Sequence, residues 1–147
     1  MSVGGAKHVW PVRVYYEDTD AGGIVYHANY LRFMERGRTE LLRAIGHDLA
    51  AQRVETGINW AVHKLTIDYL QPARLDEALE VVTRVVELRG ASVAMNQQVR
   101  HADGKGEGAL LTDATLTLVC MAATGRATRL PAQARQALAV YAEGTAA

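Results

Sequence analysis

The chain has 147 residues, a length typical of one domain with a single hydrophobic core. Lys plus Arg and Asp plus Glu number 16 each, so the formal net charge is zero, which argues against a nucleic-acid partner. Hydrophobic residues make up 49% of the chain, but no apolar run approaches the roughly 18 residues of a membrane-spanning helix. We therefore expect a compact globular domain without an integral membrane segment.

The cysteine content and the first residues indicate a compartment. Cys120 is the only cysteine, so no disulfide can form within the chain. Residues 1–10 lack the continuous apolar segment of a secretory signal. The expected location is the cytoplasm, with any membrane contact being peripheral, at the inner membrane.

An alternating segment begins at Val12. Apolar positions on one face are Val12, Val14 and Tyr16, and this period of two predicts a strand. The strand is expected to end at Asp18–Gly23, where carboxylates can accept hydrogen bonds from nearby amides and glycines permit unusual dihedral angles. A structured loop is the prediction for this segment.

Residues at helical spacing follow the loop. They are Tyr30, Phe33, Met34, Gly37, Leu41, Leu42 and Ile45. Charged residues occupy most of the complementary side, so the pattern predicts a long amphipathic helix. Gly46 stands where a left-handed cap would end it. Gly37 would cost about 1 kcal/mol in an exposed helix, so its mid-helix position indicates close approach of another backbone.

A loop through Gly57 and four further strands are expected next. The strand segments are Asn59–Leu70, Leu79–Leu88, Ser92–His101 and Ala109–Met121. Pro131 then opens a short amphipathic helix to about Tyr141. Residues 1–8 and 143–147 are expected to fray.

Five mainly antiparallel strands and one long helix predict a single α+β domain over residues 1–147, with the sheet wrapped around the helix. Several residues on the strands would make the remaining sheet face more apolar than a solvated surface. They are Val82, Val86, Leu88, Val119 and Met121. Such a face predicts an interface between subunits.

The run from Val12 to Arg43, which contains Glu-Asp-Thr-Asp-Ala-Gly-Gly-Ile-Val-Tyr-His-Ala-Asn-Tyr, resembles the 4-hydroxybenzoyl-CoA thioesterase family. The nearest branch is that of the acyl-CoA thioesterases associated with the bacterial Tol-Pal system. Similarity continues through Lys64–Tyr69 and Gln71–Asp76. The resemblance implies a hotdog fold, in which the sheet encloses the helix and two subunits join their sheets edge to edge. It also implies homodimers that commonly pair into homotetramers.

The same resemblance implies the activity and the site. The family's catalytic aspartate matches Asp20, and the branch's accompanying residues match Tyr16 and His27. The backbone N–H of His27 would polarise the thioester carbonyl, while Asp20 would attack it as nucleophile or act as general base on water. Without the family match, an aspartate before a helix more often forms an Asx turn or a cap. Asp18 is expected to have such a structural role.

Weaker similarity places CoA contacts at Arg89, Ser92 and Arg129, although a surface arginine is usually only solvated. No separate cofactor is expected, because CoA is part of the substrate.

A metal is not predicted, since the histidines and Cys120 lack zinc-ligand spacing. An EF-hand beginning at Asp18 fails because it lacks the oxygen ligand of position five and the glutamate of position twelve.

The favoured function is hydrolysis of an acyl-CoA thioester, with a short aliphatic or an aromatic acyl group. An alternative is a non-catalytic hotdog protein, an adaptor for an acyl carrier protein or for a membrane-associated assembly. The presence of Tyr16, Asp20 and His27 argues against that alternative. A dehydratase of the same fold would need a different acid–base arrangement. The expected partners are the substrate, further copies of the chain and, as an additional candidate, an acyl carrier protein.

Overall fold

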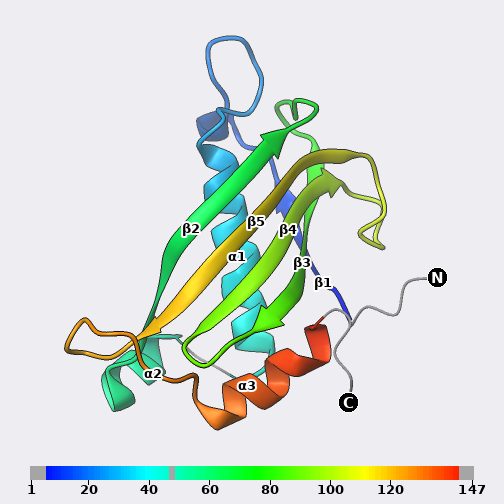
Figure 1. Ribbon diagram of the computed structural model, residues 1–147. Helices are drawn as coiled ribbons and strands as arrows, with labels where there is room; N and C mark the ends of the chain where they lie inside the picture. The colour runs from blue at the N-terminus through cyan, green and yellow to red at the C-terminus, as the bar shows by residue number, and fades with distance from the viewer. Residues whose placement is uncertain (1–5, 47–48, 143–147) are drawn as a thin grey trace.

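The computed structural model describes residues 6–46 and 49–142, and its main feature is a sheet curved around one long helix (Figure 1). The strands are β1 (His8–Arg13), β2 (Asn59–Tyr69), β3 (Ala78–Leu88), β4 (Ser92–His101) and β5 (Leu110–Met121). Their order in the sheet is β1-β3-β4-β5-β2, and every neighbouring pair is antiparallel. The predicted α+β class and five-stranded sheet are confirmed.

Helix α1 (Asn29–Ala44) fills the concave side of the sheet. Its buried residues are Tyr30, Phe33, Met34, Gly37, Leu41 and Leu42, which matches the predicted apolar stripe. A Cβ on Gly37 would lie 2.5 Å from Cγ1 of Val81 on β3. The predicted tight packing therefore occurs, but a side chain makes the close approach instead of a backbone. Gly46 has a φ of +85°, as expected for a left-handed end of the helix.

Three local expectations were wrong. The first strand begins at His8 and ends at Arg13, because the chain turns into a 3-10 helix at Tyr16–Asp18. The loop expected before Gly57 contains helix α2 (Leu49–Thr56). The C-terminal helix is shorter than expected: α3 (Ala132–Leu138) is followed by a 3-10 turn at Ala139–Tyr141.

The expected fraying of the chain ends falls partly outside the described residues, which do not include 1–5 and 143–147. Within residues 6–8, Ala6 donates its backbone N–H to the carbonyl of Val140, and His8 already belongs to β1. Ala6 and His8 therefore make main-chain contacts with the rest of the fold. None of the helices in the described part is both long and apolar enough to cross a membrane.

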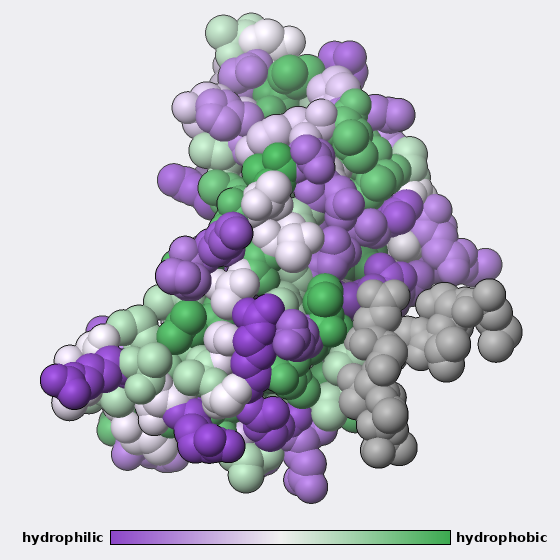
Figure 2. All heavy atoms as spheres, in the orientation of Figure 1, coloured by the Kyte–Doolittle hydropathy of each residue, from purple (hydrophilic) through white to green (hydrophobic). Residues whose placement is uncertain are grey.

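The outer face of the sheet is less apolar than the sequence predicts. Figure 2 shows hydrophilic residues mixed with hydrophobic ones over the strands on this side. A β-bulge between Val85 and Glu87 alters the alternation of β3, so Leu88 packs into the core. Val82 does face outward, but the connection between β4 and β5 covers it, since a Cβ on Gly106 would lie 3.0 Å from Cγ2 of Val82.

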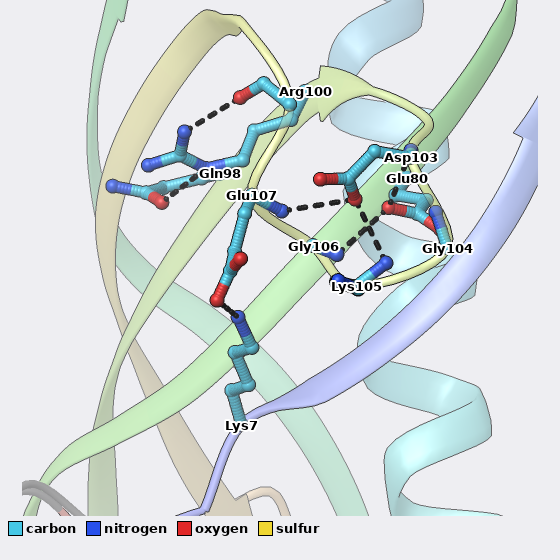
Figure 3. Close-up of polar contacts among 10 residues, drawn as sticks. Lys7, Glu80, Gln98, Arg100, Asp103, Gly104, Lys105, Gly106 and Glu107 are labelled. Carbon is cyan, nitrogen blue, oxygen red and sulfur yellow. Dashed lines mark hydrogen bonds and ion pairs between the residues drawn. The ribbon is translucent and has the colours of Figure 1, made fainter.

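That β4–β5 connection, residues 102–109, is tied down by the buried carboxylate of Glu80 on β3 (Figure 3). Glu80 accepts backbone hydrogen bonds from Gly106 at 2.9 Å, Gly104 at 3.1 Å and Asp103 at 3.4 Å. A carboxylate can accept several such bonds, so its burial is compensated by the loop's own amides. The loop is thereby fixed over β1 and β3.

Candidate active site

The Asp20 loop connects β1 to α1 and is closed by backbone hydrogen bonds. The N–H of Asp20 donates to the carbonyl of Ile24 at 2.8 Å, and the N–H of Gly23 donates to the carbonyl of Asp20 at 3.0 Å. A further bond, from the N–H of Val25 to the carbonyl of Ala73 at 2.9 Å, joins the loop to the segment before β3. The loop is thus a small, closed turn, and the segment before β3 of the same chain holds it in place.

The side chain of Asp20 forms an Asx turn and still has an oxygen to spare. Oδ1 accepts hydrogen bonds from the N–H groups of Gly22 at 2.8 Å and Ile24 at 3.4 Å. Among the contacts of the described residues, Oδ2 accepts none. The structural interpretation of Asp20 therefore accounts for one oxygen only, and the other is available to a ligand or to water.

Asp18 differs from Asp20, because both of its oxygens are used within the fold. Oδ2 accepts the N–H of Tyr15 at 2.8 Å, and Oδ1 accepts the side-chain amide of Asn29 at 2.8 Å. Asp18 is also buried, with 5% of its surface exposed. The prediction of a structural role for Asp18 is confirmed: it joins the 3-10 turn to the first residue of α1.

The N-terminus of α1 lies at the end of the same loop. No side chain caps the helix at Ala28, and in the described part of the chain the backbone N–H of His27 donates no hydrogen bond. Unpaired amides at a helix N-terminus, together with the positive end of the helix dipole, favour a negatively charged or polarised oxygen. A thioester carbonyl placed here would be polarised.

Asp20 and His27 line one cavity of about 290 Å³. The other lining residues are Ile24, Val25, Tyr30, Tyr69, Gln71 and Pro72. A carboxylate, an imidazole and two phenols thus surround a partly apolar space, the combination typical of a small-molecule site. Sequence reasoning missed Tyr69, since the alternating pattern of its strand carries no sign of a contact with a residue 42 positions away.

Tyr16 does not line this cavity. It lies in the 3-10 turn with 82% of its surface exposed, and borders a different hollow together with Tyr15, Glu17, Leu75 and Asp76. The expectation that it occupies a strand face next to the loop was wrong, because β1 ends three residues earlier. Within one chain, the structure brings together Asp20 and His27 but not Tyr16.

The residues expected to contact CoA lie together, away from Asp20. Arg89 and Ser92 flank the turn between β3 and β4, where the N–H of Arg89 donates to the carbonyl of Ser92 at 2.9 Å. A Cβ on Gly90 of this turn would lie 4.0 Å from the guanidinium of Arg129. The Asp20 loop contacts the segment before β3, whereas Arg89 follows its end, so roughly 35 Å of strand separates them (Figure 1).

Over residues 6–46 and 49–142, no group of three or more His, Cys, Asp or Glu side chains could hold a metal ion. The polar side chains that line the cavity include the carboxylate of Asp20 and the imidazole of His27, and the uncapped start of α1 follows His27 directly. This donor set suits a carbonyl substrate attacked by an oxygen nucleophile.

The fold defines the class of the protein, because it is shared with solved hotdog structures. A probable thioesterase from Bartonella henselae is 36% identical with a TM-score of 0.77, and the match covers 86% of this chain and 100% of that one. A 4-hydroxybenzoyl CoA thioesterase is 22% identical with a TM-score of 0.82, covering 90% and 98%, and at this identity it supports the fold alone. The predicted hotdog fold is confirmed.

The chain belongs to the thioesterase superfamily, whose family model matches residues 22–107, more than half of its length. The acyl-CoA thioester hydrolase YbgC of Escherichia coli is 46% identical over 112 residues, which is 76% of this chain and 80% of the relative. The acyl-CoA thioesterase YbgC of Haemophilus influenzae is 43% identical over 112 residues, or 76% and 79%. The resemblance drawn from the motif is confirmed at the level of the family.

Proposed function

We propose that the protein is an acyl-CoA thioesterase, which hydrolyses the thioester to a free acid and CoA. The observation that carries this proposal is the spare oxygen of Asp20, which lines the same cavity as His27 at the uncapped start of α1. The curated relatives named as acyl-CoA thioesterases support the substrate class. The site requires no cofactor, because the carboxylate and the helix amides supply the groups that hydrolysis needs.

In the proposed reaction the thioester carbonyl oxygen accepts the N–H of His27, which stabilises the charge that develops there. Oδ2 of Asp20 either attacks the carbonyl carbon, giving an anhydride that water then hydrolyses, or removes a proton from the attacking water. The C–S bond breaks in both routes, and the thiolate of CoA takes up a proton. The imidazole of His27, which lines the same cavity, is the proposed donor of that proton.

The proposed CoA contacts call for a second chain. Arg89, Ser92 and Arg129 lie at the opposite end of the sheet from Asp20 of the same chain. Strand β2 forms one edge of the sheet, with Val62 and Tyr69 exposed along it. Antiparallel pairing of two β2 edges would bring the arginine end of one copy toward Asp20 of the other. We therefore propose a homodimer, which two copies of the dimer can extend to a homotetramer.

The exposed position of Tyr16 has a similar consequence. Its hydroxyl can contribute to catalysis only when a ligand or a second chain covers it, since its surface is open in one chain. We propose that Tyr16 supports the reaction in the assembled protein as a hydrogen-bond donor. Tyr16→Phe would then lower turnover modestly, and unchanged turnover would remove Tyr16 from the site.

We also propose a cytoplasmic location, with contact to an acyl carrier protein or to the inner membrane as candidate interactions. Cys120 is a free thiol buried in the core and forms no disulfide, which is compatible with a reducing compartment. The balanced net charge gives no general attraction to an anionic surface, so such contacts would be local. Recovery of the protein from the periplasm on cell fractionation would contradict this location.

A thiol-release assay tests the proposed activity. The purified protein would be tested on short aliphatic, long aliphatic and aromatic acyl-CoA esters, and the cavity of about 290 Å³ favours the smaller acyl groups. Asp20→Ala should lower kcat roughly 10²- to 10⁴-fold, as expected for loss of a nucleophile or general base. A wild-type protein that is inert on all esters but binds a carrier protein would favour the adaptor. Normal turnover by Asp20→Ala would place the chemistry elsewhere.

Light scattering coupled to size exclusion tests the assembly. We expect a dimer or tetramer at assay concentrations. A protein that stays monomeric when it is concentrated would contradict a site shared between two chains. Arg129→Ala should raise KM and leave kcat nearly unchanged, because it would remove a contact to the CoA moiety that does not change during the reaction.

A further inference from the structure

Tyr69, the last residue of β2, reaches across the cavity to the start of α1. Its hydroxyl donates a hydrogen bond to the backbone carbonyl of His27 at 2.9 Å. Its ring also meets the imidazole of His27 edge-on, with ring centres 6.2 Å apart and an angle of 85° between the planes. Tyr69 therefore contacts both the backbone and the side chain of His27.

Tyr69 packs against residues that are themselves held by the core and by the Asp20 loop. Its ring packs at 5.6 Å, nearly edge-on, against Tyr30 of α1, which is buried and in edge contact with Phe33. The hydroxyl of Tyr30 accepts the N–H of Ala73 at 3.0 Å, and the carbonyl of Ala73 accepts the N–H of Val25 in the Asp20 loop. One connected set of contacts thus joins the end of β2, the start of α1 and the Asp20 loop.

Among the hydrogen bonds of the described residues, the hydroxyl of Tyr69 is the one partner of His27, whose N–H and imidazole nitrogens have none. The ring of Tyr26 lies against the imidazole with ring centres 4.5 Å apart and planes tilted by 51°, but its hydroxyl makes no hydrogen bond in the described part. Desolvation raises the pKa of the Tyr69 phenol, so the hydroxyl remains a donor at neutral pH.

We infer that Tyr69 is a positioning residue, which holds the backbone of His27 so that its N–H faces a carbonyl placed beside Asp20. This inference rests on the proposed function and assigns to Tyr69 no contact with the reacting atoms. Geometry at a polarising donor affects the transition state more than substrate binding, so loss of the hydroxyl should act on kcat.

The test compares Tyr69→Phe with Tyr26→Phe. Both changes remove one phenol oxygen beside His27 and keep the ring, but only Tyr69 uses its hydroxyl to hold the backbone. Tyr69→Phe should lower kcat about five- to tenfold with KM within twofold, as expected for the loss of one hydrogen bond that matters in the transition state. Tyr26→Phe should stay within twofold of wild type in both constants.

A second measurement reports on His27 directly. The backbone amide resonance of His27 and its imidazole resonances should shift in Tyr69→Phe. A role in stability alone would lower Tm but leave kcat of the folded enzyme and these resonances unchanged. Wild-type kcat in Tyr69→Phe, or lowered kcat with unchanged His27 resonances, overturns the inference.

The failure of the proposed function would look different. If the wild-type protein hydrolyses no acyl-CoA ester, the kinetic comparison is void, but the resonances of His27 in Tyr69→Phe and Tyr26→Phe still decide whether Tyr69 holds the helix start. A different result is an active wild type, an inactive Asp20→Ala and a Tyr69→Phe that resembles wild type in every measurement. That result would support the proposed function and contradict the positioning role of Tyr69.

Discussion

Two loops of this protein contain the same hydrogen-bonded turn and differ in what surrounds it. In the Asp20 loop, Oδ1 of Asp20 accepts the N–H groups two and four residues later, at 2.8 and 3.4 Å. In the β4–β5 loop, Oδ1 of Asp103 accepts the N–H groups of Lys105 and Glu107, again two and four residues later, at 2.7 and 3.2 Å. The local chemistry of the two aspartates is therefore nearly identical.

Their surroundings are not alike. Asp20 lines a cavity with His27 and Tyr69, next to the start of a helix. The turn around Asp103 lies over the sheet, where Glu80 binds three of its backbone amides (Figure 3). An Asx turn therefore does not identify a catalytic aspartate. The cavity and the unpaired helix amides distinguish the two loops.

The largest expected difference is in activity. Asp20→Asn should lower kcat by about 10²- to 10⁴-fold, because an amide cannot serve as nucleophile or base, although Oδ1 can still accept the turn's hydrogen bonds. Asp103→Asn makes the same change in the matched turn and should retain wild-type kcat. Thermal unfolding serves as the control, and both variants should have Tm values close to that of wild type. Equal activity in the two variants would show that the loops do not differ in function.

A difference in stability is expected next, at Glu80. Glu80→Gln replaces one acceptor oxygen by an NH₂ group, which leaves an amide of the β4–β5 loop unpaired and should lower the free energy of unfolding by about 1–3 kcal/mol. Turnover should be retained, because this loop lies away from the cavity. Glu107→Gln is the control: Glu107 is exposed and pairs with Lys7 at 3.8 Å, so its loss should cost well below ~1 kcal/mol. Urea unfolding that gives equal costs would contradict the anchoring role of Glu80.

Glycines in the two loops should respond differently to alanine. Gly23 and Gly106 have φ angles of +81° and +71°, so alanine at either position is strained by about 1–2 kcal/mol. A Cβ on Gly106 would also lie 2.9 Å from Cγ2 of Val9, whereas nothing lies within 4 Å of one on Gly23. Gly106→Ala should therefore be the more destabilising by about 1 kcal/mol or more in denaturant unfolding. A larger loss of stability in Gly23→Ala than in Gly106→Ala would mean that the β4–β5 loop does not pack closely against the sheet.

The smallest effect is expected at acid pH. Backbone hydrogen bonds from Lys105 and then Glu107 hold the pKa of Asp103 below its ordinary value of 3.8. Because the folded-state pKa is the lower one, the ionised carboxylate stabilises the fold above that ordinary value, and the contribution disappears as the pH falls through the folded-state pKa. Tm should thus decline less steeply in Asp103→Asn than in wild type below about pH 4. An unchanged slope would show that these hydrogen bonds do not favour the charged form.

Local patterns were sufficient for most of the fold. The helical spacing from Tyr30 to Ile45 and the alternation of the last four strands predicted elements whose bounds agree with the structure to within one residue. Such patterns succeed because each element buries one face against the same core. They failed where the chain departs from a regular period, as at Tyr16, where β1 gives way to a 3-10 turn, and at the bulge of β3 before Leu88.

The sequence by itself determined the hotdog family, the position of Asp20 before a long helix and the close packing at Gly37, since each depends on neighbouring residues or on a motif. Tertiary structure alone decided that Tyr69 meets His27, that Tyr16 stays outside the cavity and that Glu80 holds the β4–β5 loop. These contacts join residues far apart in the chain. Strand order and register bring them together, and no local periodicity encodes either.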